Sequence, residues 1–210
     1  RFVTGNRCEK GAGLERKGKN LPNVFEYKYK RLFSYEPLEE AYASRGVVGI
    51  PRVLNMHENY PFWFTFFTNL GFRVVLSPVS SKEIYETGME TISSDTACYP
   101  AKLVHGHIKW LVNNGVKWIF YPCINYEIKE DVSAENHYNC PIVATYPEVI
   151  ANNMDDVFAE NDVLFSHPFL PYDDDIRLVR QLYEVMRNLH IGFNEISKAV
   201  KAARKEDKHF

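Results

Sequence analysis

From Gly46 onward, short apolar runs rich in β-branched and aromatic residues alternate with longer segments of helical period. Five runs are expected to form strands: Gly46–Ile50, Phe72–Leu76, Val116–Phe120, Ile142–Thr145 and Val163–Ser166. Helices are expected over Tyr60–Leu70, Ser80–Thr87, Cys98–Asn114, Asp173–His190 and Ile196–Lys205. Strands separated by helices of this length pair in parallel through crossover connections. The pattern therefore predicts an α/β fold with an open, mostly parallel sheet of about five strands and helices on both faces.

The segment before Gly46 reads differently from the rest of the chain. Residues 1–20 are rich in Gly, Lys and Arg and show no sustained period, and residues 21–43 predict one or two short helices. We therefore expect three parts: an N-terminal arm over residues 1–45, an α/β body over residues 46–170 and C-terminal helices over residues 171–210. Because the chain begins at Arg1 and not at Met, it is interpreted as a piece of a longer polypeptide.

Charge and hydropathy argue against two classes of partner. The formal net charge of −2 gives no electrostatic reason to bind nucleic acid. The longest apolar stretch, Tyr60–Val75, is interrupted by polar residues and by Gly71, so no membrane span is expected. Four cysteines in 210 residues, without a secretory signal, argue against a disulfide scaffold and favour a reducing cytoplasm.

Two of the cysteines occupy positions that suit a metal site. Pro100 is typical of the first turn of a helix, so Cys98 is expected at a helix N-terminus, where unpaired N–H groups stabilise a thiolate. A small residue buried at a helix start is an equally good interpretation of Cys98. Cys123 follows the third expected strand, at the carboxyl edge of the sheet where ligands gather, and this position favours function.

The other two cysteines are less clearly placed. If a strand begins at Pro141, Cys140 lies at the amino edge of the sheet, roughly 17 Å of strand away from Cys123. Either the strand begins later or Cys140 does not share a cluster with Cys123. A cysteine followed by proline does recur at iron–sulfur sites. Cys8 lies in the Gly-rich arm, where an incidental surface cysteine is the simpler interpretation.

No two cysteines form a Cys-x-x-Cys pair, so a zinc ribbon is not expected. His105 follows Cys98 by seven residues and shares nearly the same helix face. It could approach the same site, although a hydrogen-bonded histidine is the simpler interpretation. Spacing alone does not identify a cluster in this sequence.

Three longer runs carry a resemblance to a known family: Gly49–Trp63, Ser94–His107 and Tyr121–Ile124. They resemble a domain found in large proteins that also contain the ATP-dependent activator module of 2-hydroxyacyl-CoA dehydratases. The same runs are similar to the dehydratase subunits and to double-cubane-cluster proteins. The likeness extends over about residues 1–170.

The resemblance implies a flavodoxin-like or Rossmann-like domain, one of a facing pair. It implies that Cys98 and Cys123 match cluster-binding cysteines of the dehydratase subunits, and that a second α/β domain supplies further ligands to a [4Fe–4S] or double-cubane cluster. Cys140 then need not be a ligand. The run Asn6–Gly13 loosely resembles the cluster loop of the activator, with one residue fewer before Cys8. The implied partner is the activator module, in the same chain or a separate one.

Two hypotheses follow. In the first, the chain is an iron–sulfur domain of a low-potential redox enzyme of the reductase or dehydratase type, inactive in isolation, with Cys98, Cys123, Cys140 and Cys8 as candidate ligands. In the second, it is a cluster-free module that binds the activator or a CoA-like ligand. A plain small-molecule-binding α/β domain is a third option.

Overall fold

The computed structural model describes residues 22–209, in two compact units that divide between Arg31 and Leu32. The first unit contains most of helix α1 (Val24–Leu32), in which the side-chain oxygen of Asn23 accepts a hydrogen bond from the Glu26 N–H. An ion pair between Lys30 and Glu26, one helical turn apart, supports the same helix. The second unit contains all the remaining elements.

The second unit is built on a four-stranded sheet in which every pairing is parallel. Its strands are β1 (Val47–Ile50), β2 (Arg73–Leu76), β3 (Trp118–Phe120) and β4 (Leu164–Ser166), in the order β2-β1-β3-β4. Gly49 of β1 lies opposite both Val75 of β2 and Ile119 of β3. The chain leaves β1 in one direction to form β2 and returns on the other side to form β3. This reversal places the topological switch point between β1 and β3.

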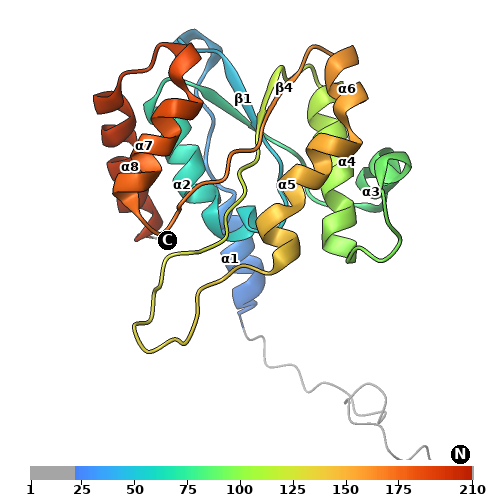
Figure 1. The fold of residues 1–210 in the computed structure, drawn as a ribbon, viewed down its shortest axis with the longest axis horizontal. Helices are drawn as coiled ribbons and strands as arrows, with labels where there is room; N and C mark the ends of the chain where they lie inside the picture. Colours follow the sequence, from blue (N-terminus) through green and yellow to red (C-terminus); the bar gives the residue numbers. More distant parts are fainter. Residues whose placement is uncertain (1–21, 210) are drawn as a thin grey trace, which may run out of the picture. The chain divides into compact units, whose positions relative to one another are not determined.

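Helices cover both faces of the sheet (Figure 1). One layer contains α2 (Met56–Asn69), α7 (Asp175–Val185) and α8 (Phe193–Asp207). The other contains α3 (Lys82–Gly88), α4 (Tyr99–Asn113), α5 (Pro141–Asn153) and α6 (Asp155–Glu160). Short 3₁₀ turns occur at Glu40–Tyr42, Met89–Thr91 and Arg187–Leu189. The predicted α/β fold with a parallel sheet is confirmed.

The expectation of a strand over Ile142–Thr145 is wrong. These residues form the first turns of α5, so the described chain has four strands and not about five. A short β-branched run cannot be told from a helix by periodicity alone. The longer window decides it, because Ala144, Pro147 and Ile150 are buried at helical spacing and Pro141 occupies the first turn.

An aromatic core joins α2 to the sheet. Trp63 and Phe67 of α2 pack against Phe120 of β3 with ring centroids 4.9 and 5.0 Å apart, and Phe67 also meets Trp118 edge-on at 5.5 Å. These side chains are almost fully buried. Burial of this size and edge-to-face geometry make the aromatic cluster a main source of stability.

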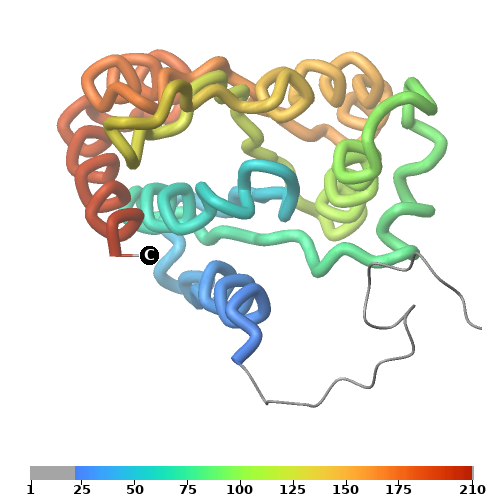
Figure 2. The backbone as a smooth tube through the Cα atoms, turned by 90° about the horizontal axis from the view of Figure 1, so that it is seen from below, coloured from blue at the N-terminus to red at the C-terminus, as the bar shows by residue number. Residues whose placement is uncertain are grey.

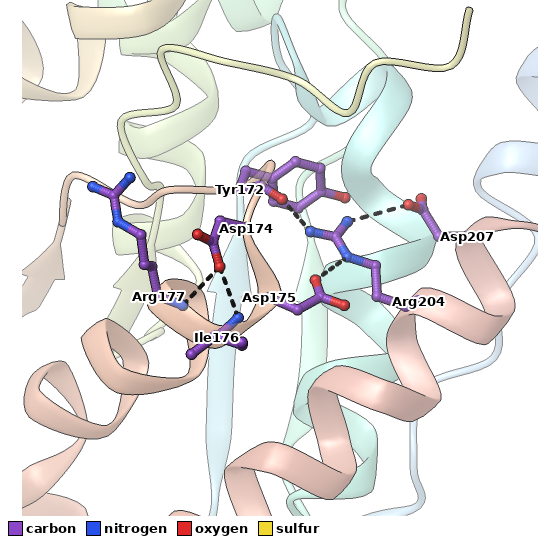
Figure 3. A network of polar contacts seen from close by, with 7 residues as sticks. All are labelled: Tyr172, Asp174, Asp175, Ile176, Arg177, Arg204 and Asp207. Carbon is purple, nitrogen blue, oxygen red and sulfur yellow. Dashed lines mark hydrogen bonds and ion pairs between the residues drawn. The ribbon is translucent and has the colours of Figure 1, made fainter. Parts of the chain in front are cut away.

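Arg204 of α8 makes polar contacts with several residues of the helical layer (Figure 3). Its guanidinium donates to the backbone oxygen of Tyr172 and pairs with Asp175 at 2.8 Å and Asp207 at 3.4 Å. It also lies over the rings of Phe62 and Tyr172, 4.5 and 4.2 Å from their centroids. One buried cation thus connects α2, the residues before α7, and α8.

Replacing this arginine is expected to destabilise the domain. Arg204→Leu leaves the Tyr172 carbonyl and a partly buried Asp207 without their donor, and burial already raises the pKa of Asp207. Because both carboxylates remain partly exposed to water, the expected loss is about 2 kcal/mol, below that of a fully buried pair. Urea unfolding measures it. Arg187→Leu, at an exposed ion pair, is the control and should change stability little.

Candidate functional site

Cys98 caps helix α4 at its N-terminus, as the sequence predicts. Its backbone is extended and its side chain makes no capping hydrogen bond, so the exposed thiol stands beside the unpaired N–H groups of the first turn. His107, nine residues further along α4, bonds through Nδ1 to Oγ of Ser77 at 2.8 Å, directly after β2. At about 1.5 Å per residue, Cys98 therefore projects roughly 13 Å beyond the end of β2.

Cys140 holds the same position on α5. It is the N-cap of that helix, its thiol is exposed, and its side chain makes no capping bond. Glu148, two turns later, contacts Nε2 of His167 at 3.3 Å, directly after β4. Cys140 therefore projects roughly 12 Å beyond the carboxyl end of β4. The condition under which Cys140 would lie at the amino edge is not met, because helix α5 and not a strand begins at Pro141.

Cys123 belongs to the same edge. It lies three residues after β3, about 10 Å beyond the strand end. Its backbone continues the pairing of β3 with β4. The Cys123 N–H donates to the carbonyl oxygen of Pro168 at 2.9 Å, and its carbonyl oxygen accepts from the Leu170 N–H at 3.0 Å. The residue is fully buried. Burial, followed by the nearby Glu148 carboxylate, raises the pKa of the Cys123 thiol to about 12, so without a metal this thiol stays protonated.

A hydrogen bond fixes the register of the two capped helices. Nε2 of His105 on α4 lies 3.0 Å from the Tyr146 hydroxyl on α5. Cys98 precedes His105 by seven residues, and Cys140 precedes Tyr146 by six, so both caps lie at nearly the same level. In Figure 1 the lower ends of α4 and α5 are their first residues, and Figure 2 views the same elements from below. Cys98 and Cys140, whose thiols are exposed, are thus the N-caps of two parallel, neighbouring helices.

Two buried tyrosines, Tyr146 and Tyr121, lie near Cys98 and Cys123. Burial and then the nearby Cys98 raise the pKa of Tyr146. Burial, then Cys123, then Tyr146 raise the pKa of Tyr121 well above its usual value. Cys98 therefore lies near Tyr146, and Cys123 lies near Tyr121.

The two histidines of α4 are structural within this arrangement. His105 bonds to Thr91 Oγ1 at 2.8 Å as well as to Tyr146, and His107 bonds to Ser80 Oγ at 2.9 Å as well as to Ser77. Both rings are fully buried, and burial lowers the pKa of each to about 4. Both imidazoles are neutral at pH 7, and each ring nitrogen has a hydroxyl partner.

A long loop between β3 and α5, residues 121–140, positions Cys140. Glu127 in this loop accepts hydrogen bonds from Asn59 of α2 at 3.1 Å and from Asn139 at 2.6 Å. Asn139 also donates to the carbonyl of Ile124 at 3.0 Å. Burial raises the pKa of Glu127, although the two amides oppose this effect. A polar network that starts on α2 thus fixes the residue next to Cys140.

The predicted ligands can be placed as follows. Cys98, Cys123 and Cys140 project from one edge of the sheet, and Cys8 lies outside the described residues. Within residues 22–209, no three His, Cys, Asp or Glu side chains lie close enough together to hold a metal ion. Sequence reasoning missed Glu127, Asn59 and Asn139. The available signal was the length of the loop, because irregular connections of this length are uncommon and often functional.

Comparison with known proteins settles the family. Residues 47–210 match the CoA enzyme activase uncharacterised domain (DUF2229). The chain belongs to this family. No curated protein and no solved structure matches it. The match covers the whole sheet and Cys98, Cys123 and Cys140, and it supports the relation to CoA enzyme activases that the sequence indicates. Over residues 22–209 no helix is long and apolar enough to cross a membrane.

Proposed function

We propose that this activase domain contributes cysteine ligands to an iron–sulfur cluster, in a redox system that takes electrons from an ATP-dependent activator. The observation that carries the proposal is the common position of three cysteines, which all project about 10 to 13 Å beyond the strand ends at one edge of the sheet. Two of them cap parallel helices. In open α/β sheets this edge is where ligands bind.

The donors fit such a group in part. Cys98 and Cys140 present exposed thiols beside helix N-termini, whose N–H groups stabilise thiolates and can donate to cluster sulfides. Cys123 is buried and protonated in the absence of metal, and metal binding displaces the proton of a coordinating thiol. Since these thiols alone do not form a closed metal site within residues 22–209, further ligands would come from a facing α/β domain. When bound, the cluster supplies one-electron chemistry at low potential.

The domain's own residues have distinct roles in this proposal. The His105–Tyr146 bond holds the two capping cysteines level, and the Glu127 network holds Asn139 beside Cys140. The buried side chains of Tyr121 and Tyr146, near Cys123 and Cys98, exclude water there, and exclusion of solvent is one of the factors that set a cluster potential.

Anaerobic reconstitution with iron and sulfide tests the proposal. A small thiol in the buffer stands in for ligands of the facing domain. We expect the wild-type chain to take up iron and sulfide and to show an EPR signal after reduction, and we expect the double variant Cys98→Ser, Cys140→Ser to take up several-fold less. Serine is a preferred N-cap, so this variant should fold. Ser81→Ala, which removes the capping bond of α3 but no thiol, is the control and should keep the wild-type iron content.

Equal iron content in the double variant and the wild type would contradict the proposal, as would no uptake by the wild type. Binding of an activator ATPase that survives substitution of all the cysteines, together with no uptake of iron, would instead favour a cluster-free docking module.

A further inference from the structure

A second feature of the same edge is a polar pocket of about 610 Å³ between the end of β3, the residues after β4, and α7. Its lining includes Cys123 and Asn125 after β3, Phe169 after β4, and Arg177 and Arg180 of α7. Its volume is within the range of pockets for small molecules. Its place outside the carboxyl ends of parallel strands is also the usual one for such sites.

Two arginines give the pocket its charge. Arg177 and Arg180 are three residues apart, so they share one face of α7, and both side chains are exposed. Asp173 is the acidic residue of the lining, and in the part of the chain that the structure describes no ion pair joins it or any other carboxylate to either guanidinium. Two guanidinium groups without a protein counter-ion form a site suited to carboxylate or phosphate oxygens.

The lining of the pocket also includes two aromatic side chains, Tyr126 and Phe169. The rings of Tyr126 and Phe169 are 40% and 48% exposed, although side chains of this size are usually more deeply buried. The ring of Tyr126 packs against Tyr138 at 4.8 Å and against His137 at 5.4 Å, so the β3–α5 loop holds it in place. Aromatic side chains and two cations in the lining of one pocket favour a ligand with a flat organic body and an anionic group.

We propose that this pocket binds a small organic molecule through a carboxylate or phosphate group, which Arg177 and Arg180 hold while Tyr126 and Phe169 contact its body. The evidence for binding is the pocket itself. The bound molecule would lie beside Cys123, and its role as a reactant of the redox site rests on the proposed function.

Calorimetric titration of the chain with phenyl phosphate and with benzoate, at constant ionic strength, tests the proposal. We expect saturable binding of at least one probe. Preference for phenyl phosphate indicates a phosphorylated ligand, and preference for benzoate indicates an organic acid. The double variant Arg177→Gln, Arg180→Gln should weaken binding at least tenfold, which corresponds to about 1.4 kcal/mol. Both side chains are exposed, so the variant should fold as the wild type does.

Arg187→Gln removes an equally exposed arginine just after α7 and outside the pocket, and it should leave the affinity unchanged. Absence of saturable binding of both probes would overturn the proposal, as would equal affinity in the double variant or an equal loss in Arg187→Gln. The Cys98→Ser, Cys140→Ser variant separates this proposal from the cluster. It should bind the probe with wild-type affinity whether or not it takes up iron.

Discussion

Acidification from pH 7.5 to 4.5 is expected to destabilise this domain by several kcal/mol, with His105 and His107 as the main cause. Both rings are buried, and their pKa lies near 4 in the folded state against an ordinary value of 6.5. Above pH 6.5 the rings are neutral in the folded and unfolded chain alike. Between pH 6.5 and 4 the unfolded chain binds protons that the folded chain excludes, so the free energy of unfolding falls as the pH falls. Each histidine accounts for about 3 kcal/mol by pH 4.

Urea unfolding at pH 7.5, 6.0, 5.0 and 4.5 measures this loss. The double variant His105→Gln, His107→Gln cannot take up these protons, so its free energy of unfolding should depend much less on pH over this range. His190→Gln removes an exposed histidine and is the control, which should keep the wild-type slope. If the double variant shows the wild-type slope, protonation of these rings is not the cause.

Gly106→Ala is expected to be the most damaging single substitution in the domain. Helices α3 and α4 touch through glycine backbones: a Cβ on Gly106 would lie 1.8 Å from the carbonyl oxygen of Ile84, and one on Gly88 would lie 2.2 Å from the backbone nitrogen of Gly106. Backbone atoms cannot rotate away as a side chain can, so the two helices must separate. The expected loss is about 4 kcal/mol, at the upper end for overpacked cores.

Separation of α3 from α4 would also strain the bonds of His105 to Thr91 and of His107 to Ser80, because these histidines flank Gly106. Thermal and urea unfolding of Gly106→Ala give the loss. Gly192→Ala is the matched control, because the added Cβ meets only a Glu195 carboxylate oxygen at 3.4 Å. Stability of Gly106→Ala within about 1 kcal/mol of the control would show that the two helices can shift apart at little cost.

The sequence predicted those parts of the fold that local patterns determine. Each buried strand is an apolar run next to a helix of regular period, so the parallel architecture could be inferred without contacts. Pro100 correctly identified the start of α4 and the capping position of Cys98. The same signal was present at Pro141, but the β-branched residues that follow it were interpreted as a strand. A strand there would have placed Cys140 at the amino edge of the sheet, so the error left the position of Cys140 open.

The polar part of the site could not be predicted because it depends on contacts between distant residues. Asn59 and Glu127 are 68 positions apart, and only the packing of the β3–α5 loop on α2 brings them together. The two bonds of His105 likewise require Thr91 and Tyr146 to arrive from different elements. In the sequence Arg177 and Arg180 resemble ordinary solvated charges on an amphipathic helix, and only the fold brings Tyr126 and Phe169 into the lining of the same pocket.

The backbone bridge at Cys123 has a mechanical consequence. Cys123 pairs with Phe169, and both its N–H and its carbonyl are bonded to the segment that follows β4. Phe169 and Leu170 of that segment also line the pocket beside the arginines. A molecule that contacts Phe169 would therefore touch the strand extension to which the backbone of Cys123 is bonded. Two backbone hydrogen bonds thus hold Cys123 to the same segment that lines the pocket.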